Sequence, residues 1–371
     1  MSQAPRQSLP PAAHAALATL VLCIATVCYT FHMPDFTRFL VGMNDFLPRY
    51  SQARFVGAGD LYDVKANYRE QDHATGMHIS GLPDRLPWEA LLMAPLSRLP
   101  YLWAYWIWIG INLAAFFLLV LLWLAPRGFA LWGAVFFPVA ATLILGQDGI
   151  LLSLCLAGTL LLAKNHQDWA AGLVLALCTA KPHLFVLVPL ALIVHRRWSI
   201  VYGAIVGTTG LLILGTVAAG WDWPARLWPL LKSMPGDWHA VGTRPTVFEL
   251  GVNSVSIAVA IAVAIVFVIL IWRSSSLEAG IGAAFIGSLL IAPHGAVYDL
   301  PILLVALLAM PLPSHARRLR FALLTPIPYW LLLRGSPWTW VFILMLLATA
   351  AASTLAPPDS SEVNAAIPEG V

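Results

Sequence analysis

Long apolar segments separated by short polar breaks run through most of the chain. They fall at about 13–33, 102–124, 129–145, 149–164, 169–180, 183–195, 199–219, 254–272, 277–292, 299–312, 319–334 and 338–355. A bilayer core of roughly 30 Å is crossed by a helix of about 20 apolar residues. The pattern predicts an all-α polytopic membrane protein with about twelve crossings. Ten or eleven is the alternative, because the segments at 169–180 and 183–195 are short.

Two longer polar stretches, 34–101 and 220–253, interrupt this pattern. Within the first, helical periodicity from Phe46 to Val56 predicts an amphipathic helix on the membrane surface. We expect residues 1–355 to form one transmembrane domain that includes both stretches as outer loops. The tail at 356–371 contains Pro, Ser and Glu and is expected to be a disordered cytoplasmic segment.

Basic residues in the short loops indicate how the chain is oriented. With a cytoplasmic N-terminus, one side receives Arg127, Lys164, Arg196, Arg197, Arg273, Arg317, Arg318 and Arg320. In the short loops of the other side, only Lys181 and Arg334 are basic. Because cytoplasmic loops carry an excess of Lys and Arg, both long loops are predicted to face the periplasm of a bacterial inner membrane. The first apolar segment is interpreted as a retained helix.

Composition supports the membrane assignment and excludes several classes of function. Hydrophobic residues make up 60% of the chain and charged residues 11%, against about 25% charged in soluble domains. The four cysteines lie in apolar segments without CxxC spacing, so neither a structural metal nor a disulfide framework is indicated. The sequence has no glycine-rich phosphate loop, HExxH or GxSxG motif.

Ionisable and polar residues gather on the predicted outer side, where they are candidates for function because burying them near lipid is unfavourable. Asp45 follows the first apolar segment. Its carboxylate is either a general base or the N-cap of the helix that follows, and the two interpretations are compatible. Gln147 and Asp148 form either a tight turn or the polar lip of a cavity.

Lys181 and His294 have two interpretations each. Lys181 is either a side chain that snorkels to the interface or, beside the helix break at Pro182, a phosphate ligand. His294 is either a hydrogen-bonded core residue or part of the same outer site. Among the polar residues of the second long loop, Arg244 is the strongest candidate for a role.

An ordered set of short motifs extends from about residue 40 to 305. These are Asp45-Phe46-Leu47-Pro48-Arg49-Tyr50, Leu61-Tyr62-Asp63, Leu86-Pro87-Trp88, Gly146-Gln147-Asp148-Gly149, Lys181-Pro182-His183, Pro245-Thr246-Val247-Phe248 and Pro293-His294 with Tyr298-Asp299. In this order they resemble glycosyltransferase family 87. Its members are membrane proteins of the GT-C class that include polyprenyl-phosphate-mannose-dependent mannosyltransferases.

The resemblance implies a GT-C-type helix bundle with an outer-facing active site. The donor would be a hexose, mannose above all, on a polyprenyl phosphate, and the acceptor a hydroxyl of a glycolipid, glycan or protein. Asp45 would be the catalytic base, and Lys181 and His294 would face the donor phosphate. Gln147, Tyr50, Arg244 and Tyr298 would bind substrate. No cofactor, metal or nucleic acid is expected.

A transporter or flippase of a lipid-linked or small polar substrate is the competing hypothesis, and a structural assembly subunit is a third. A transporter would carry polar residues along its helices to both faces of the membrane. Here they cluster on the outer side, which favours the enzyme.

Overall fold

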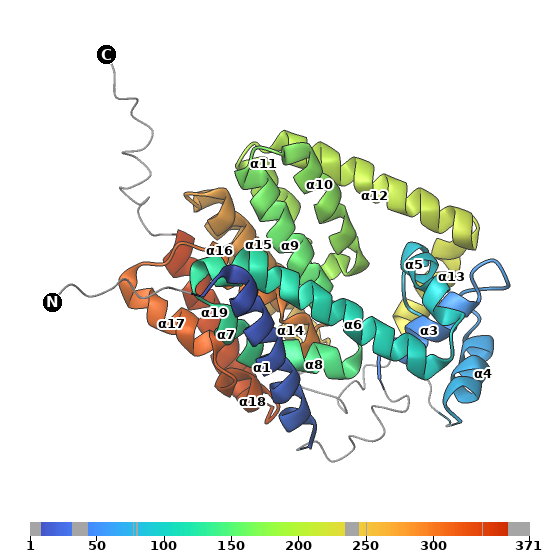
Figure 1. The fold of residues 1–371 in the computed structure, drawn as a ribbon. Helices are drawn as coiled ribbons and strands as arrows, with labels where there is room; N and C mark the ends of the chain where they lie inside the picture. The colour runs from blue at the N-terminus through green and yellow to red at the C-terminus, as the bar shows by residue number, and fades with distance from the viewer. Residues whose placement is uncertain are drawn as a thin grey trace. The chain divides into compact units, whose positions relative to one another are not determined.

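The computed structural model describes residues 9–31, 44–76, 78, 81–233, 245–249, 251–335 and 337–354 (Figure 1). Every regular element in these ranges is a helix, which confirms the all-α prediction. The predicted tail at 356–371 and Arg244 lie outside the described residues. The expectation of a single domain over residues 1–355 remains a prediction.

Contacts within the chain define two compact units, which are described separately. Unit 1 contains Met1–Ala157, Thr209–Pro235 and Tyr298–Pro301. Unit 2 contains Gly158–Thr208, Gly236–Val297 and Ile302–Val371.

Among the described residues, four helical segments are long and apolar enough to cross a membrane. They are Pro11–Phe31, Tyr101–Arg127, Trp198–Ala219 and Ser254–Arg273. Shorter apolar helices lie at Gly149–Lys164, Asp168–Ala180, Leu277–Ile291 and Trp338–Thr354. The structure therefore supports a membrane protein with four candidate spans, and the expected ten to twelve crossings are not confirmed.

Proline explains why two predicted segments are divided. The segment at 129–145 consists of α7 (Ala130–Val135) and α8 (Phe137–Leu145), with Pro138 in the first turn of α8. The segment at 319–334 is similarly interrupted at Pro326, between α17 (Ser314–Leu324) and α18 (Ile327–Leu332). Proline has no N–H to donate and is tolerated only near a helix start, so it ends one helix and begins the next.

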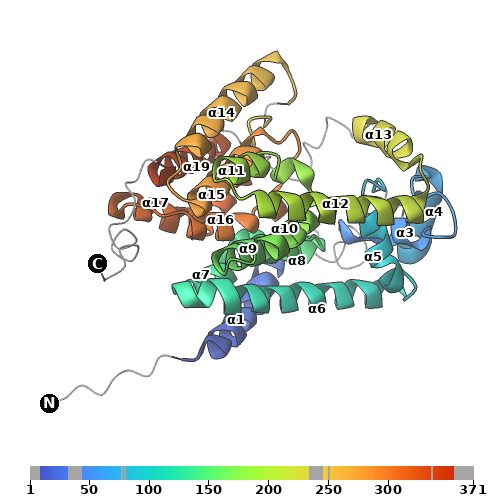
Figure 2. The same ribbon diagram turned by 90° about the horizontal axis from the view of Figure 1, so that it is seen from above.

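In unit 1, α1 (Pro11–Phe31) packs against α7, α8 and α6 (Tyr101–Leu119) (Figure 2). The helix of α6 continues through a π-helical turn at Val120–Leu124 and a 3₁₀ turn at Ala125–Arg127. Leu17, Leu20, Ile24 and Val27 of α1 are exposed, as expected for a helix that faces lipid.

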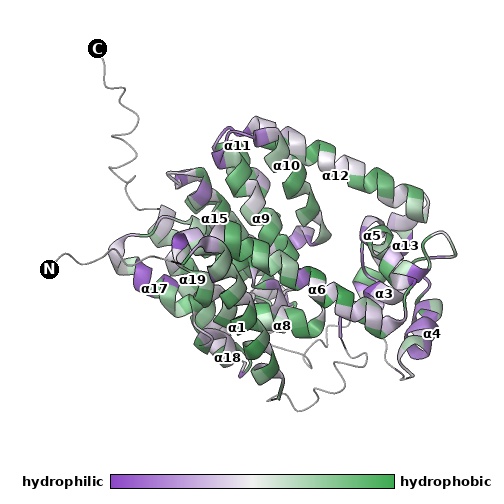
Figure 3. Cartoon of the chain, in the orientation of Figure 1, coloured by the Kyte–Doolittle hydropathy of each residue, from purple (hydrophilic) through white to green (hydrophobic). Residues whose placement is uncertain are grey.

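Four further helices of unit 1 come from the two long loops. They are α3 (Phe46–Arg54), α4 (Val64–Thr75), α5 (Pro87–Ser97) and α13 (Trp223–Ser233). Figure 3 shows that α4 is largely hydrophilic. Helix α3 packs against α4, α5 and α6. The arginine of α13, Arg226, binds the carboxylate of Asp60 at 2.6 Å and so attaches α13 to the first loop.

The predicted helix from Phe46 is confirmed, but it is not amphipathic in the expected sense. Its polar side chains Arg49, Ser51 and Gln52 are all buried. Ser51 donates to the Asn67 side chain at 3.1 Å, and Gln52 donates to the Arg85 carbonyl at 3.1 Å. Polar partners from distant segments thus satisfy a face that sequence periodicity assigned to solvent.

Unit 2 is built around α15 (Leu277–Ile291), whose residues from Ala279 to Leu290 are all buried. Helices α11 (Val188–Val194), α14 (Ser254–Arg273), α16 (Ile302–Ala309) and α19 (Trp338–Thr354) pack on it. Helix α10 (Asp168–Ala176) approaches α12 (Trp198–Ala219) closely at two glycines, Gly172 and Gly203. Helix α9 (Gly149–Lys164) contributes residues to both units.

Candidate active site

Backbone and side-chain hydrogen bonds fix the start of α3 in unit 1. The N–H of Asp45 donates to the carbonyl of Leu145, the last residue of α8, at 3.0 Å. The side-chain oxygen of Asn44 accepts from the N–H groups of Phe46 at 3.1 Å and Leu47 at 3.2 Å. Asn44 therefore caps the helix, and the Asp45 side chain makes no cap hydrogen bond. The N-cap interpretation of the Asp45 carboxylate was wrong.

The turn after α8 depends on two glycines. Gly146 has φ +65°, and a Cβ there would lie 2.7 Å from the Cβ of Phe46. At Gly149, a Cβ would collide with the carbonyl oxygen of Tyr298. The indole N–H of Trp108 donates to the Gly146 carbonyl at 2.8 Å. Only glycine permits this backbone path and this close approach, so the turn presents the two residues between them in a fixed position.

One of those residues, Gln147, connects Asp45 to two arginines. Its side-chain nitrogen donates to Oδ2 of Asp45 at 2.6 Å. Its side-chain oxygen accepts from Nη2 of Arg49 at 2.9 Å and from Nη2 of Arg85 at 3.4 Å. Because arginine can only donate and a carboxylate can only accept, the partners determine which way the amide faces. Gln147 is 1% exposed.

The other residue of the turn, Asp148, forms an ion pair with Arg49. Nη2 of Arg49 lies 2.8 Å from Oδ2 of Asp148, and the two side chains are 5% and 8% exposed. The Arg49 guanidinium also lies over the ring of Trp108, 5.9 Å from its centroid. A buried ion pair is tolerated where further hydrogen bonds share the desolvation penalty, as Gln147 does here.

The charges around this pair also act on residues of α5 and of the 3₁₀ turn Val297–Asp299. Burial raises the pKa of Glu89 to about 7, although Arg85 and Arg49 oppose the shift. Burial would lower the pKa of Arg85, but the carboxylates of Asp84, Asp148 and Glu89 outweigh it and keep the guanidinium charged.

Tyr298 belongs to the same cluster. Burial raises the pKa of Tyr298 well above its ordinary value, and the charges of Asp45 and Asp299 raise it further. Its backbone carbonyl accepts a hydrogen bond from the Thr142 hydroxyl at 2.9 Å. The phenol therefore stays protonated at neutral pH and can donate a hydrogen bond. The structure thus brings together three of the predicted site residues, Asp45, Gln147 and Tyr298.

Tyr50 occupies a different position in unit 1. Its ring packs among the aromatic side chains of Phe46 and Tyr101, and its hydroxyl donates to the carbonyl of Leu99 at 2.8 Å. This position supports the packing of α3, and the substrate-binding role of Tyr50 remains a prediction.

Lys181 and His294 lie in unit 2. Lys181 separates the 3₁₀ turns Leu177–Ala180 and Pro182–Leu184 and is 4% exposed, unlike a side chain that snorkels to an interface. The ring of His294 lies 5.9 Å, centroid to centroid, from the ring of His183. Two titratable rings thus meet in this unit.

Within the described ranges, no group of three or more His, Cys, Asp or Glu side chains could hold a metal ion.

Comparison with known proteins identifies the family. The sequence profile of glycosyltransferase family 87 matches residues 87–311, more than half of the chain. The chain belongs to glycosyltransferase family 87. Searches among curated proteins and among solved structures give no significant match.

Membership of family 87, together with the apolar helices, makes this protein a membrane glycosyltransferase. It favours the enzyme over the transporter and the assembly subunit. The matched range includes Gln147, Lys181, His294 and Tyr298, whereas Asp45 precedes it. The part of the resemblance before residue 87 therefore rests on the motifs alone.

Three residues around Gln147 in unit 1 were not singled out from the sequence: Arg49, Arg85 and Glu89. In unit 2 the same holds for His183, whose ring lies near that of His294. Arg49 lies four residues after Asp45, a spacing that places both on one face of a helix. Arg85 and Glu89 flank the motif Leu86-Pro87-Trp88. These were the available signals, but no local pattern shows that their partners lie on the turn after α8.

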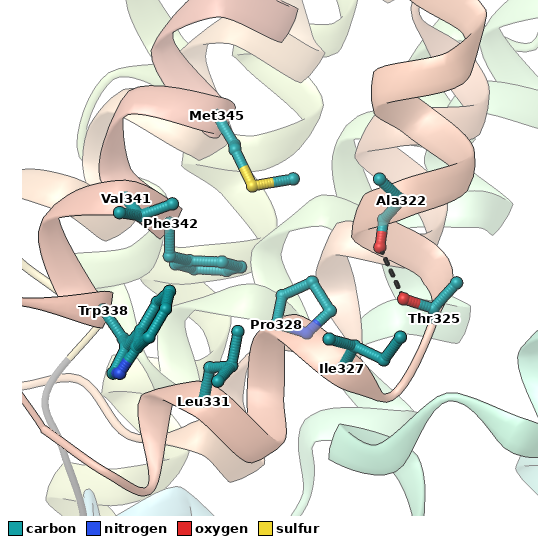
Figure 4. A pocket seen from close by; sticks show the side chains of 9 residues that line it. All are labelled: Ala322, Thr325, Ile327, Pro328, Leu331, Trp338, Val341, Phe342 and Met345. Atoms are coloured by element: carbon teal, nitrogen blue, oxygen red, sulfur yellow. Dashed lines mark hydrogen bonds between the residues drawn. The ribbon is translucent and has the colours of Figure 1, made fainter.

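An apolar pocket of about 340 Å³ lies among α17, α18 and α19, after the family 87 match ends (Figure 4). It is lined by Ala322, Thr325, Ile327, Pro328, Leu331, Trp338, Val341, Phe342 and Met345. The Thr325 hydroxyl donates to the carbonyl of Ala322 at 2.8 Å. The lining contains no acidic or basic side chain, so it supplies no group for acid–base catalysis.

Proposed function

We propose that this family 87 enzyme transfers a hexose, mannose in the first instance, from a polyprenyl phosphate to an acceptor hydroxyl. The reaction takes place at the periplasmic face of a bacterial inner membrane. The acceptor is a hydroxyl of a glycolipid, a glycan or a protein.

In the proposed reaction, Asp45 removes the proton from the acceptor hydroxyl. The resulting oxygen attacks the anomeric carbon, and a new carbon–oxygen bond forms as the bond to the phosphate breaks. The electron pair of the broken bond stays on the polyprenyl phosphate, and the anomeric configuration inverts. Lys181 and His294 stabilise the charge of the departing phosphate, so the proposal includes no metal or other cofactor. Tyr298, Tyr50 and Arg244 contribute to substrate binding.

The hydrogen bond from Gln147 to Asp45 is the observation that carries this proposal. It holds a partly exposed carboxylate in a single orientation beside a buried, charged network. An oriented carboxylate that does not cap its helix has the chemistry required of a general base. The lipid-linked donor is supported by the family resemblance, and the outer location by the distribution of Lys and Arg.

Asp45→Asn tests the base directly. We expect purified Asp45→Asn in proteoliposomes to lose activity about 100-fold or more with radiolabelled polyprenyl-phosphate mannose, in line with the usual contribution of a general base. Asp63→Asn is the matched control, because Asp63 lies in the same loop and caps α4 by accepting from the Ala66 N–H. Full activity of Asp45→Asn at normal yield would refute the assignment.

The same proteoliposomes test the donor class. Radiolabel is expected to pass from polyprenyl-phosphate mannose to acceptor lipids or glycans, and not from a nucleotide sugar. Transfer from the nucleotide sugar alone would exclude the proposed donor. Transfer from polyprenyl-phosphate glucose but not mannose would keep the donor class and change the sugar.

Single cysteines in a cysteine-free background test the orientation. Lys65 on α4 and Arg318 on α17 are both exposed. We expect a membrane-impermeant thiol reagent to label Lys65→Cys in intact cells and Arg318→Cys only after lysis. The reverse pattern would place the active site on the cytoplasmic face.

A further inference from the structure

Gln147 has the surroundings of a residue that acts on another side chain. It is 1% exposed, and both ends of its amide are engaged within the protein. The glycines on either side fix its backbone, and its N–H donates to the Thr142 carbonyl at 2.9 Å. A side chain held in this way has little surface to offer to a sugar.

The two arginines also change the electronic character of the amide. Charge-assisted hydrogen bonds to the side-chain oxygen polarise the amide group, which makes its N–H a stronger donor. That N–H donates to the Asp45 carboxylate at 2.6 Å. A strong donor favours the ionised form of a carboxylate, and a base must be ionised to accept a proton.

We propose that Gln147 is a positioning residue: held by Arg49 and Arg85, it orients the Asp45 carboxylate and keeps it ionised. This inference rests on the proposed role of Asp45 as the base. It assigns Gln147 to the control of the base in place of the expected contact with substrate. Arg49 and Arg85 act through Gln147.

Charged and titratable groups from four segments of unit 1 form the electrostatic surroundings of Asp45. The segments are α3, residues 84–89, the turn after α8 and residues 298–299. The groups are Arg49, Asp84, Arg85, Glu89, Asp148, Tyr298 and Asp299. Of these groups, Arg49 and Arg85 are cationic and bond the side-chain oxygen of Gln147. A glutamate in place of Gln147 could still accept hydrogen bonds from both arginines, but it would add a negative charge beside Asp45.

The test is the pH dependence of kcat/KM in Gln147→Glu. This variant loses the donor to Asp45 and adds a negative charge, so the base holds its proton up to a higher pH. We expect the acid limb of the profile to move upward by about one pH unit or more, with the KM for the donor within about threefold of wild type. Gln71→Glu is the matched control. Gln71 is a buried glutamine of unit 1 that bonds Ser51 and the Gly81 backbone, and its variant should leave the limb in place.

Gln147→Met provides the second measurement, because it preserves volume without adding charge. We expect a lower kcat and an upward shift of the same limb. If either variant instead raises KM and leaves the limb unmoved, Gln147 binds substrate and the inference is wrong. An active Asp45→Asn would refute the proposed base itself, whereas an inactive Asp45→Asn with an unmoved limb in either Gln147 variant would refute only the positioning role.

Discussion

Arg49 and Asp148 form a buried ion pair, 2.8 Å from nitrogen to oxygen, between α3 and the turn that follows α8. On the same helix, Arg54 forms an ion pair of the same length with Glu70, but there the side chains are 40% and 20% exposed. The two pairs differ mainly in their contact with water.

Asp148→Asn is therefore expected to destabilise unit 1 strongly. It leaves the Arg49 guanidinium buried without its counter-charge, which typically costs about 3–5 kcal/mol. Glu70→Gln should cost about 1 kcal/mol or less, because solvent screens the exposed pair. Thermal unfolding of the detergent-solubilised proteins measures both. Equal losses would show that burial does not set the strength of the pair.

Asn44 and Asp45 are expected to have separate roles, Asn44 in helix capping and Asp45 in catalysis. Asn44→Ala removes the side chain that accepts from the Phe46 and Leu47 N–H groups, and should cost about 1 kcal/mol of stability. Asp45→Asn should leave the thermal midpoint almost unchanged while transfer activity is lost. A large stability loss in Asp45→Asn would instead indicate that the carboxylate is structural.

Glu89 should make stability depend on pH. Its pKa is raised from the usual value near 4.5 to about 7, so the folded protein binds a proton that the unfolded chain releases in this interval. Stability is therefore expected to fall as pH rises from about 4.5 through 7, by about 2 kcal/mol at roughly 1.4 kcal/mol per pKa unit with allowance for partial exposure. Glu89→Gln should flatten the thermal midpoint between pH 5 and 8. An unchanged slope in this variant would exclude Glu89 as its source.

The crossing of α10 and α12 should tolerate no side chain at Gly203. A Cβ there would collide with the carbonyl oxygen of Trp169 and lie 3.1 Å from the Cα of Gly172. Gly203→Leu should lower the thermal midpoint and the membrane yield, since overpacking costs about 1–3 kcal/mol or more. Gly210→Leu is the matched control on the same helix, because a Cβ at Gly210 meets nothing within 4 Å. Similar losses in both variants would point to helix propensity as the cause.

Local sequence patterns predicted the helices well. The expected segments at 199–219 and 254–272 match Trp198–Ala219 and Ser254–Arg273 to within one residue. This succeeds because apolar length and helix-ending residues are local properties of the chain. The predicted number of crossings is not confirmed by the same comparison, since proline divides apolar segments such as 129–145 and 319–334 into short helices.

The site was predictable only in part, because its partners come from distant positions. The motifs singled out Asp45, Gln147 and Tyr298, which the structure places together. They did not reveal that Asn44 would take the capping role or that Arg49 would be buried. Both outcomes depend on partners far along the sequence from α3: the Tyr101 hydroxyl donates to Asn44, and Asp148 in the turn after α8 pairs with Arg49. The spacing of polar residues along a helix does not show whether their side chains bond to water or to buried partners from other segments.

The pairing of α3 with the turn after α8 also has a consequence for biosynthesis. Arg49 leaves the ribosome well before Asp148 and Gln147 are made, so α3 cannot reach its buried state until α8 has been synthesised. During that interval the loop that carries Asp45 must remain hydrated, because the Arg49 guanidinium does not yet have the Asp148 carboxylate as its counter-ion. Proteases that survey newly inserted membrane proteins would thus meet the first loop in an open form. Completion of the candidate active site and resistance of that loop to cleavage are then expected to arise in the same step.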